Sequence, residues 1–318
     1  MIDFRYHVVS IVAVFLALAL GLFLGSTTLQ GRVFDDLKGR TDTLSHQRDA
    51  LSTQLGAATD RIKADQTFDK ALLPYAVAGR LSGQLVSIVS APGTSDAVRK
   101  QVIAAVDAAG GTLSADVRLQ NALVDPKQSA FLSALTERVT IPGHPNAANA
   151  DGPARAAAQL AAVLGVRPAA HGVPPATVDT VLAAYTTGKL LSLGNGVATP
   201  RPGTLAVVLT GPAPAPTSDP ASVKAEQGFV LDLLRDLDDS ALGAVLAVPT
   251  PAAGATTDDL TKLAAATGNL TDHASTVSGI DTPAGLITTV FALAQQADGV
   301  AGTYGPQASP LPASSVAP

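Results

Sequence analysis

The sequence predicts an α/β protein with three parts in chain order: a transmembrane helix, a coiled-coil helix and a Rossmann-like domain with a mainly parallel sheet. An uncharged apolar run near the N-terminus predicts the first part, and a heptad repeat predicts the second. Strands separated by helices predict the third. We expect a tail at 1–7, the transmembrane helix at 8–25, the coiled-coil helix at 30–73, the α/β domain at 80–305 and a disordered tail at 306–318.

The composition narrows the chemistry that is open to the chain. Its 318 residues carry a net charge of −5, which argues against a nucleic-acid-binding surface. Cysteine is absent, so disulfides, thiolate zinc sites, iron–sulfur clusters and a cysteine nucleophile are excluded. Met1 is the only methionine, which rules out a thioether copper site. These absences remove most of the possible chemistry, and we expect no cofactor and no enzymatic activity; a degenerate α/β enzyme is the alternative, motivated only by the fold class.

The run Val8–Gly25 has the length and composition of a membrane span. It carries no charge, and 18 residues at about 1.5 Å each give roughly 27 Å, close to the ~30 Å hydrocarbon core. Twelve of these residues are Val, Ile, Leu or Phe, and at about −0.3 to −0.6 kcal/mol each their insertion gains roughly 4–7 kcal/mol. The predicted anchor residues are Val8, Ile11, Val14, Phe15, Leu18, Leu22 and Leu24.

A cleaved secretory signal is the alternative to a permanent anchor. Signal cores usually run about 7–15 residues and end in a site with small side chains, whereas Phe23 would occupy the third position before a cut at Ser26. We therefore predict an uncleaved anchor. Charges lie on both sides of the span, so the positive-inside rule does not decide its orientation. The short N-tail with Arg5 favours a single-pass protein of the cell membrane, with the N-terminus cytoplasmic and the C-terminal domain outside.

A heptad repeat runs from Phe34 to Asp65, and seven of its ten a and d positions are apolar. The stripe is narrow, as in coiled coils, although a single amphipathic helix lying on the globular domain is the alternative. Arg48 at an a position disfavours a tight homodimer or sets its register. Pro74 and Gly79 are expected to break the helix. The predicted partner face consists of Phe34, Leu37, Leu44, Leu51, Leu55 and Ile62.

From Leu85 onward, strands and helices alternate. We expect strands at 85–90, 112–119, 190–193, 205–210, 244–248 and 275–280. We expect helices at 96–109, 127–139, 153–164, 175–187, 222–237, 257–266 and 283–296, several of which begin with capping residues or proline. The strands at 205–210 and 244–248 are almost entirely apolar, which is typical of strands buried on both faces.

No motif for catalysis or nucleotide binding is complete. Ligands bind beyond the carboxyl ends of parallel strands, but the loops there, 91–94, 211–214 and 249–251, contain prolines that offer no N–H to a phosphate. The glycines of 188–189 and 194–196 fit caps or turns, because the phosphate-binding patterns that they begin are not completed. The five histidines lie at least 27 positions apart, and the acidic residues at 232–239 are predicted to form a solvated helix face.

Two stretches carry a resemblance to a known family. The first comprises Arg5, His7 and the run 12–26, and the second comprises 275–277, 281–288, 292–293 and 302–305, with motif positions Asp281, Pro283, Gly285, Thr288, Tyr304 and Gly305. With a coiled coil between the anchor and the α/β domain, the whole chain resembles the actinobacterial MctB family, usually labelled copper transporters. The chain departs from that pattern at Leu286 and Thr303, where the resemblance would place Arg and His.

The resemblance implies a cell-envelope protein that lowers intracellular copper. Because the residues show no copper site, we expect a role in copper homeostasis or efflux that works through assembly, with copper as a partner by resemblance only. The alternative from the same family is a SteB-like coiled-coil scaffold that binds a SteA-like membrane partner and influences cell-wall hydrolysis at division. The expected partners are therefore the membrane and, through the coiled coil, another protein or a second copy.

Overall fold

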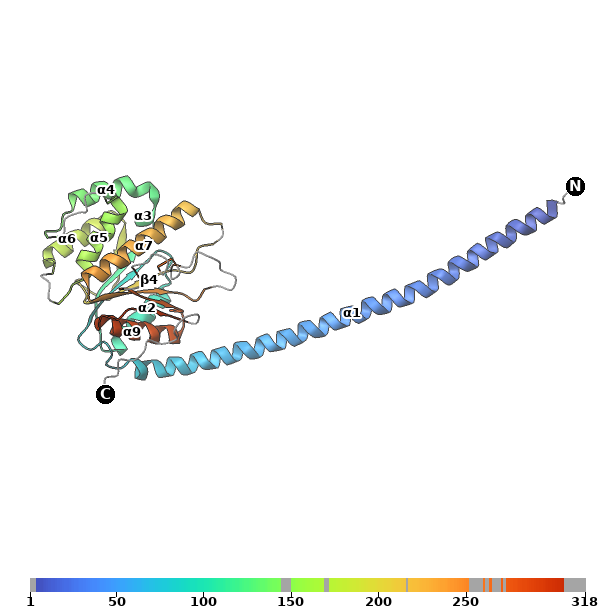
Figure 1. Cartoon of the computed structure of the whole chain (residues 1–318), viewed down its shortest axis with the longest axis horizontal. Helices are drawn as coiled ribbons and strands as arrows, with labels where there is room; N and C mark the ends of the chain where they lie inside the picture. The colour runs from blue at the N-terminus through green and yellow to red at the C-terminus, as the bar shows by residue number, and fades with distance from the viewer. Residues whose placement is uncertain are drawn as a thin grey trace. The chain divides into compact units, whose positions relative to one another are not determined.

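The computed structural model describes residues 4–143, 150–168, 172–215, 217–251, 260, 263–264, 270 and 273–305, with the side chains of 26–36 outside this description (Figure 1). The chain divides into two compact units, residues 1–65 and 66–318, each of which is described by itself. The predicted tail at 306–318 lies outside the described residues.

A single helix, α1 (Phe4–Val77), contains both the predicted membrane span and the whole of the predicted coiled-coil segment. The expectation that Pro74 breaks this helix is wrong, because α1 continues for three residues beyond it. Proline removes one backbone donor, which is tolerable here because the helix ends within the next turn. Gly79, with a φ of 72°, lies in the turn that follows, as predicted for a helix-ending glycine.

Seven strands of the described chain form one sheet in the order β3-β2-β1-β4-β5-β6-β7. Neighbouring strands are parallel, except that β3 runs antiparallel to β2. Their bounds are β1 (Leu85–Ser90), β2 (Thr112–Leu119), β3 (Leu191–Leu193), β4 (Leu205–Leu209), β5 (Gly243–Val248), β6 (Ser275–Ser278) and β7 (Thr303–Tyr304). The predicted mixed α/β class with a mostly parallel sheet is confirmed, while the Rossmann-like description stays a prediction.

The helices of the second unit lie close to their predicted positions. They are α2 (Asp96–Ala108), α3 (Asn121–Val124), α4 (Ser129–Arg138), α5 (Gly152–Leu164), α6 (Pro175–Thr187), α7 (Pro220–Ser240) and α9 (Pro283–Ala297), with a 3₁₀ turn at Pro126–Gln128 before α4. The short elements α3 and β7 were not predicted, since two to four residues carry too little periodicity to be recognised. Most of the predicted helix at 257–266 lies outside the described residues.

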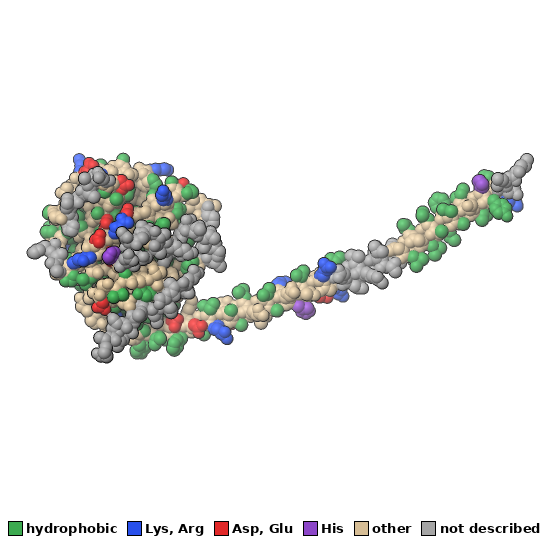
Figure 2. Space-filling view, viewed as in Figure 1, with side chains coloured by type: hydrophobic (Ala, Val, Ile, Leu, Met, Phe, Trp, Pro, Cys, Tyr) green, Lys and Arg blue, Asp and Glu red, His purple; other side chains and the backbone are tan. Residues whose placement is uncertain are grey.

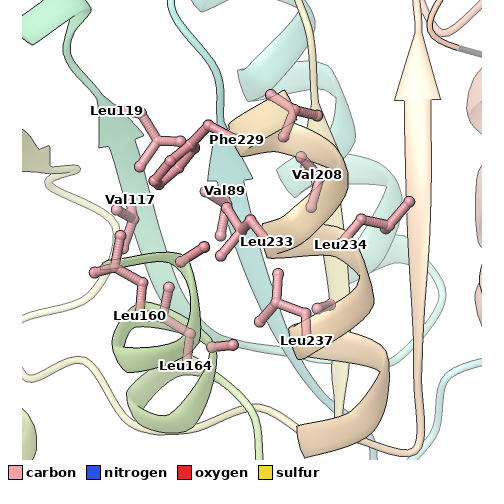
Figure 3. Packing of buried hydrophobic residues seen from close by; sticks show 14 of the residues in the cluster. Val89, Val117, Leu119, Leu160, Leu164, Val208, Phe229, Leu233, Leu234 and Leu237 are labelled. Carbon is pink, nitrogen blue, oxygen red and sulfur yellow. The ribbon is translucent and has the colours of Figure 1, made fainter. Parts of the chain in front are cut away.

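The sheet has a hydrophobic core on each face. On one face, Val89 and Val208 pack with α5 and α7, from which Leu160 and Leu233 extend toward the strands (Figure 3). On the other face, Ile88 and its neighbours pack with α2 and α9. Both faces of the sheet are therefore covered by helices, as is usual for a parallel sheet.

Candidate functional site

The apolar segment Phe4–Gly25 of α1 is the one candidate membrane span among the described residues. Its mean hydropathy reaches 2.8, and none of it is buried inside the protein (Figure 2). The predicted anchor side chains are 44% to 77% exposed: Val8, Ile11, Val14, Phe15, Leu18, Leu22 and Leu24. A helix satisfies its own backbone hydrogen bonds, as hydrocarbon requires, so this segment can cross a bilayer as it stands.

The predicted partner face of α1 is exposed wherever its side chains are described. Leu37, Leu44, Leu51, Leu55 and Ile62 are 56% to 71% exposed, and the side chain of Phe34 lies outside the described ones. Their heptad spacing places them along one face of the helix, which we call the leucine seam. The pairing of this seam with another helix stays a prediction.

The seam contains one charged side chain near its middle. Nη2 of Arg48 lies 2.8 Å from Oδ1 of Asp49, and both side chains are well exposed. An exposed pair of this kind contributes about 0–1 kcal/mol, so it leaves Arg48 available to a stronger acidic partner. The seam therefore combines apolar area with one position that discriminates between partners.

The motif that carries the family resemblance joins β5 and β6 to α9. Oδ1 of Asp281 accepts hydrogen bonds from the backbone N–H of Thr250 at 2.6 Å and from its hydroxyl at 2.8 Å, which ties the loop after β5 to the turn before α9. Thr282 caps α9 by accepting from the N–H of Gly285 at 3.1 Å. Pro283 takes the first helical position, where no N–H is needed.

The same motif excludes side chains where the backbones approach closely. A Cβ on Gly285 would overlap the carbonyl oxygen of Gly279 and lie 2.9 Å from the nitrogen of Ile280. Gly305 has a φ of 146°, and a Cβ there would collide with the side chain of Ser278. Both glycines are therefore required by the fold at this joint.

The hydroxyl groups of the motif are used within the same joint. Thr288 donates to the carbonyl of Ala284 at 2.8 Å, and the buried Tyr304 donates to Oε1 of Gln295 at 2.5 Å. Thr303, where the resemblance would place His, shares a hydrogen bond with Thr276 at 3.2 Å. These contacts give the motif a structural role: it locks the β6–β7 edge of the sheet onto α9.

The loops after β1 and β4 pack directly on each other. The N–H of Ala91 donates to the carbonyl of Leu209 at 2.7 Å, and the hydroxyl of Thr94 donates to the same carbonyl at 3.2 Å. A Cβ on Gly211 would lie 2.8 Å from the carbonyl oxygen of Gly93. In this sheet order β1 and β4 flank the crevice where open α/β sheets commonly bind ligands. Here the backbones of the two loops fill that position.

A charged cluster at the ends of β1 and β2 was not predicted. Arg99 of α2 is 7% exposed and donates through Nη1 to Oδ2 of Asp116, which is 1% exposed on β2. Asp96 accepts from Nε of Arg99 at 3.3 Å and from Nη1 of Arg118 at 3.4 Å. The sequence held one signal: Asp116 and Arg118 alternate within a strand that is covered on both faces, so their face had to meet another charged group.

The acidic residues of α7 differ from the predicted solvated face. Asp238 is only 9% exposed and accepts the N–H of Ala244 at 3.1 Å, so the prediction is wrong for this residue. Burial raises the pKa of the Asp238 carboxyl. Burial, followed by repulsion from Asp232, raises the pKa of Asp236 to about 6. The carboxylates near the end of α7 are therefore partly withdrawn from water by the packing of the helix.

Comparison with known proteins identifies the family. The sequence model of the family described as "Copper transport outer membrane protein, MctB" matches residues 1–314. The chain belongs to the MctB family. The proteins named Copper transporter MctB of Mycobacterium tuberculosis (strain H37Rv) and Mycobacterium bovis are 32% identical over 188 residues, covering 58% of this chain and 60% of theirs. The Mycobacterium leprae protein of that name is 30% identical over 142 residues, 45% of each chain. The matched region thus spans less than two thirds of these relatives.

The family is named for copper transport, but no set of copper-binding side chains is evident among the described residues. Among those residues, no three His, Cys, Asp or Glu side chains gather in a group that could hold a metal ion. His144 and His171 lie outside the described residues. The expectation that this MctB-family chain has no internal copper site therefore stays a prediction.

Proposed function

We propose that this protein of the MctB family is a single-pass, membrane-anchored envelope protein that serves copper homeostasis through assembly with other chains, without an internal metal site and without enzymatic activity. The observation that carries the proposal is the continuity of α1, which begins as an apolar span and continues as the leucine seam. One span cannot enclose a pore, so any movement of copper requires further chains. The seam offers the surface for recruiting them.

The proposed orientation places the N-terminus in the cytoplasm and the α/β domain outside. It rests on the short N-tail with Arg5, because charges on both flanks leave the positive-inside rule undecided. Protease treatment of intact spheroplasts tests it. Cleavage of the α/β domain from outside is the expected result, and complete protection would reverse the orientation.

Copper content in a deletion strain tests the copper role and the assembly role together. The strain is complemented with the natural chain, with the seam variant L44D/L51D, or with the control T43D/A50D, which adds the same charges beside the seam at the same spacing. We expect the natural chain and the control to restore low intracellular copper, and the seam variant to fail. Equal copper in the deletion and parent strains would exclude the copper role, and full restoration by L44D/L51D would exclude assembly through the seam.

The second candidate is the SteB-like scaffold, in which the seam binds a SteA-like membrane partner and influences cell-wall hydrolysis at division. Arg48 favours this candidate, because in a parallel homodimer it would face its own copy, whereas an acidic partner residue would neutralise it. A photo-crosslinking residue at position 51 tests it in cells. Crosslinks to a different membrane protein, with septation defects on deletion, are expected; crosslinks to the same chain alone would rule the candidate out.

A further inference from the structure

Two arginines converge on the first turn of α2. Asp96 accepts from Nε of Arg99 at 3.3 Å and from Nη1 of Arg118 at 3.4 Å, distances beyond the usual range of a strong charge-assisted hydrogen bond. The side chain of Arg99 is only 8% exposed, and Asp116 holds it in place through an ion pair with Nη1. The side chain of Asp96 is 65% exposed, so its carboxylate is held only loosely beside the buried guanidinium of Arg99.

Unpartnered polar atoms are concentrated at the same place. Four buried side-chain nitrogen or oxygen atoms of the described residues lack a hydrogen-bond partner, and three of them are Oγ of Ser90, Oδ1 of Asp116 and Nε of Arg118. In the parallel register Ser90 lies beside Arg118, and Ile88 lies beside Asp116, which places the three polar side chains on one face of neighbouring strands. Buried polar atoms are nearly always bonded, so three of them on one face of two paired strands indicate a missing hydrogen-bonding group.

The chemistry of the cluster selects a small oxyanion. Two guanidinium groups, a serine hydroxyl and the positive end of the 13-residue helix α2 all favour negatively charged oxygens. The free oxygen of Asp116 is an acceptor and needs a hydrogen donor, so it favours an anion that still carries a proton. Phosphate near neutral pH combines both properties. The proline-containing loop 91–94 does not have to cradle this anion, because side chains supply its partners.

We propose that the end of β1 and β2, beside the first turn of α2, binds a small protonated oxyanion of the phosphate class, and that the Asp96 carboxylate occupies its place in the unliganded protein. Binding swings Asp96 outward into solvent. Arg118 and Arg99 then donate to the ligand oxygens, Ser90 donates its hydroxyl, and Asp116 accepts the ligand proton. This site is separate from the leucine seam and goes beyond the proposed assembly function.

Titration of the detergent-solubilised full chain with inorganic phosphate by isothermal calorimetry, at constant ionic strength and pH 7, tests the proposal. D96N removes the competing charge and should bind phosphate about tenfold more tightly than the natural chain. R118Q should bind at least about tenfold more weakly. The controls D232N and R235Q alter a matched i,i+3 pair on α7 and should leave phosphate binding unchanged.

Unfolding of R118Q would also abolish phosphate binding, whereas D96N is expected to gain binding, so D96N keeps the test decisive even where R118Q unfolds. Absence of phosphate binding in D96N would overturn the proposal. Equal affinity in D96N, R118Q and the two α7 controls would also overturn it, because the ion would then bind without using this cluster.

Discussion

Substitution of Gly285 by alanine should destabilise the α/β unit, although alanine is the better helix former. Gly285 is the third helical residue of α9. The added Cβ would overlap the carbonyl oxygen of Gly279 and lie 2.9 Å from the nitrogen of Ile280. Both neighbours belong to the backbone of a turn that is fixed by hydrogen bonds to the carbonyl of Val248. Neither neighbour can rotate away, so α9 has to move.

The cost of that movement can be worked out from the bonds at the joint. The carbonyl of Gly279 accepts from the N–H of Thr282 at 2.9 Å and from its hydroxyl at 2.7 Å, and the hydroxyl accepts from Gly285 at 3.1 Å. Losing these three bonds at about 0.5–1.5 kcal/mol each costs about 2–4 kcal/mol. The helix preference of alanine returns up to about 1 kcal/mol. The net loss of about 1–3 kcal/mol corresponds to a fall in melting temperature of about 2–12 °C.

Thermal unfolding of the full chain in detergent, followed by circular dichroism, measures this effect. Gly228 supplies the matched control, because it lies exposed within α7 and a Cβ there would meet nothing within 4 Å. G228A should leave the melting temperature unchanged or raise it, since only the helix preference acts. If G285A melts at the same temperature as G228A, the reasoning about the joint is refuted.

Three further predictions concern the anchor, the acidic helix and the buried tyrosine. L18R should raise the free energy of membrane insertion by about 3–4 kcal/mol, which offsets about half or more of the gain of the span, and should lower the fraction of protein retained in carbonate-washed membranes; an unchanged membrane fraction would contradict the anchor. Because the folded pKa of Asp236 is raised to about 6 from 3.8, its protonated form stabilises the fold at low pH, and this contribution is lost as the pH rises from about 4 to 6. D236N should therefore match the natural chain in free energy of unfolding at pH 4 and exceed it at pH 7 by about 1–2 kcal/mol after allowance for solvent screening, as measured by thermal unfolding at both pH values; a difference that does not depend on pH would be the opposing result. Y304F loses the hydrogen bond to Gln295 and should cost about 1–2 kcal/mol, seen as a lower melting temperature and contradicted by an unchanged one.

Local signals explain why much of the architecture could be predicted. Ser95 caps α2 through its hydroxyl, and Thr282 caps α9, both within three residues of the bonded N–H. The apolar runs that became β4 and β5 are buried at every position. Hydrophobic period and capping act over a few neighbouring residues, so they can be recognised in one sequence without knowledge of the partners.

The candidate site was harder to predict because charged residues look alike in a sequence. Asp238 and Asp239 are neighbours on α7, yet only Asp238 is buried. Arg99 and Asp116 come from a helix and a strand 17 positions apart, and their pairing depends on how α2 lies on the sheet. The antiparallel direction of β3 also depends on its pairing with β2 and has no local signature.

Residue spacing along the chain was enough to predict an apolar segment long enough to span a membrane, the leucine seam and the alternating strands and helices, since each of these depends on residues close together in the sequence. The packing of distant elements was needed to show that the resemblance motif is a joint between β5, β6 and α9, and that an arginine and an aspartate of α2 meet an arginine and an aspartate of β2. Burial and ion pairing are properties of the packed arrangement, because the same side chain is hydrated or desolvated according to which distant element covers it.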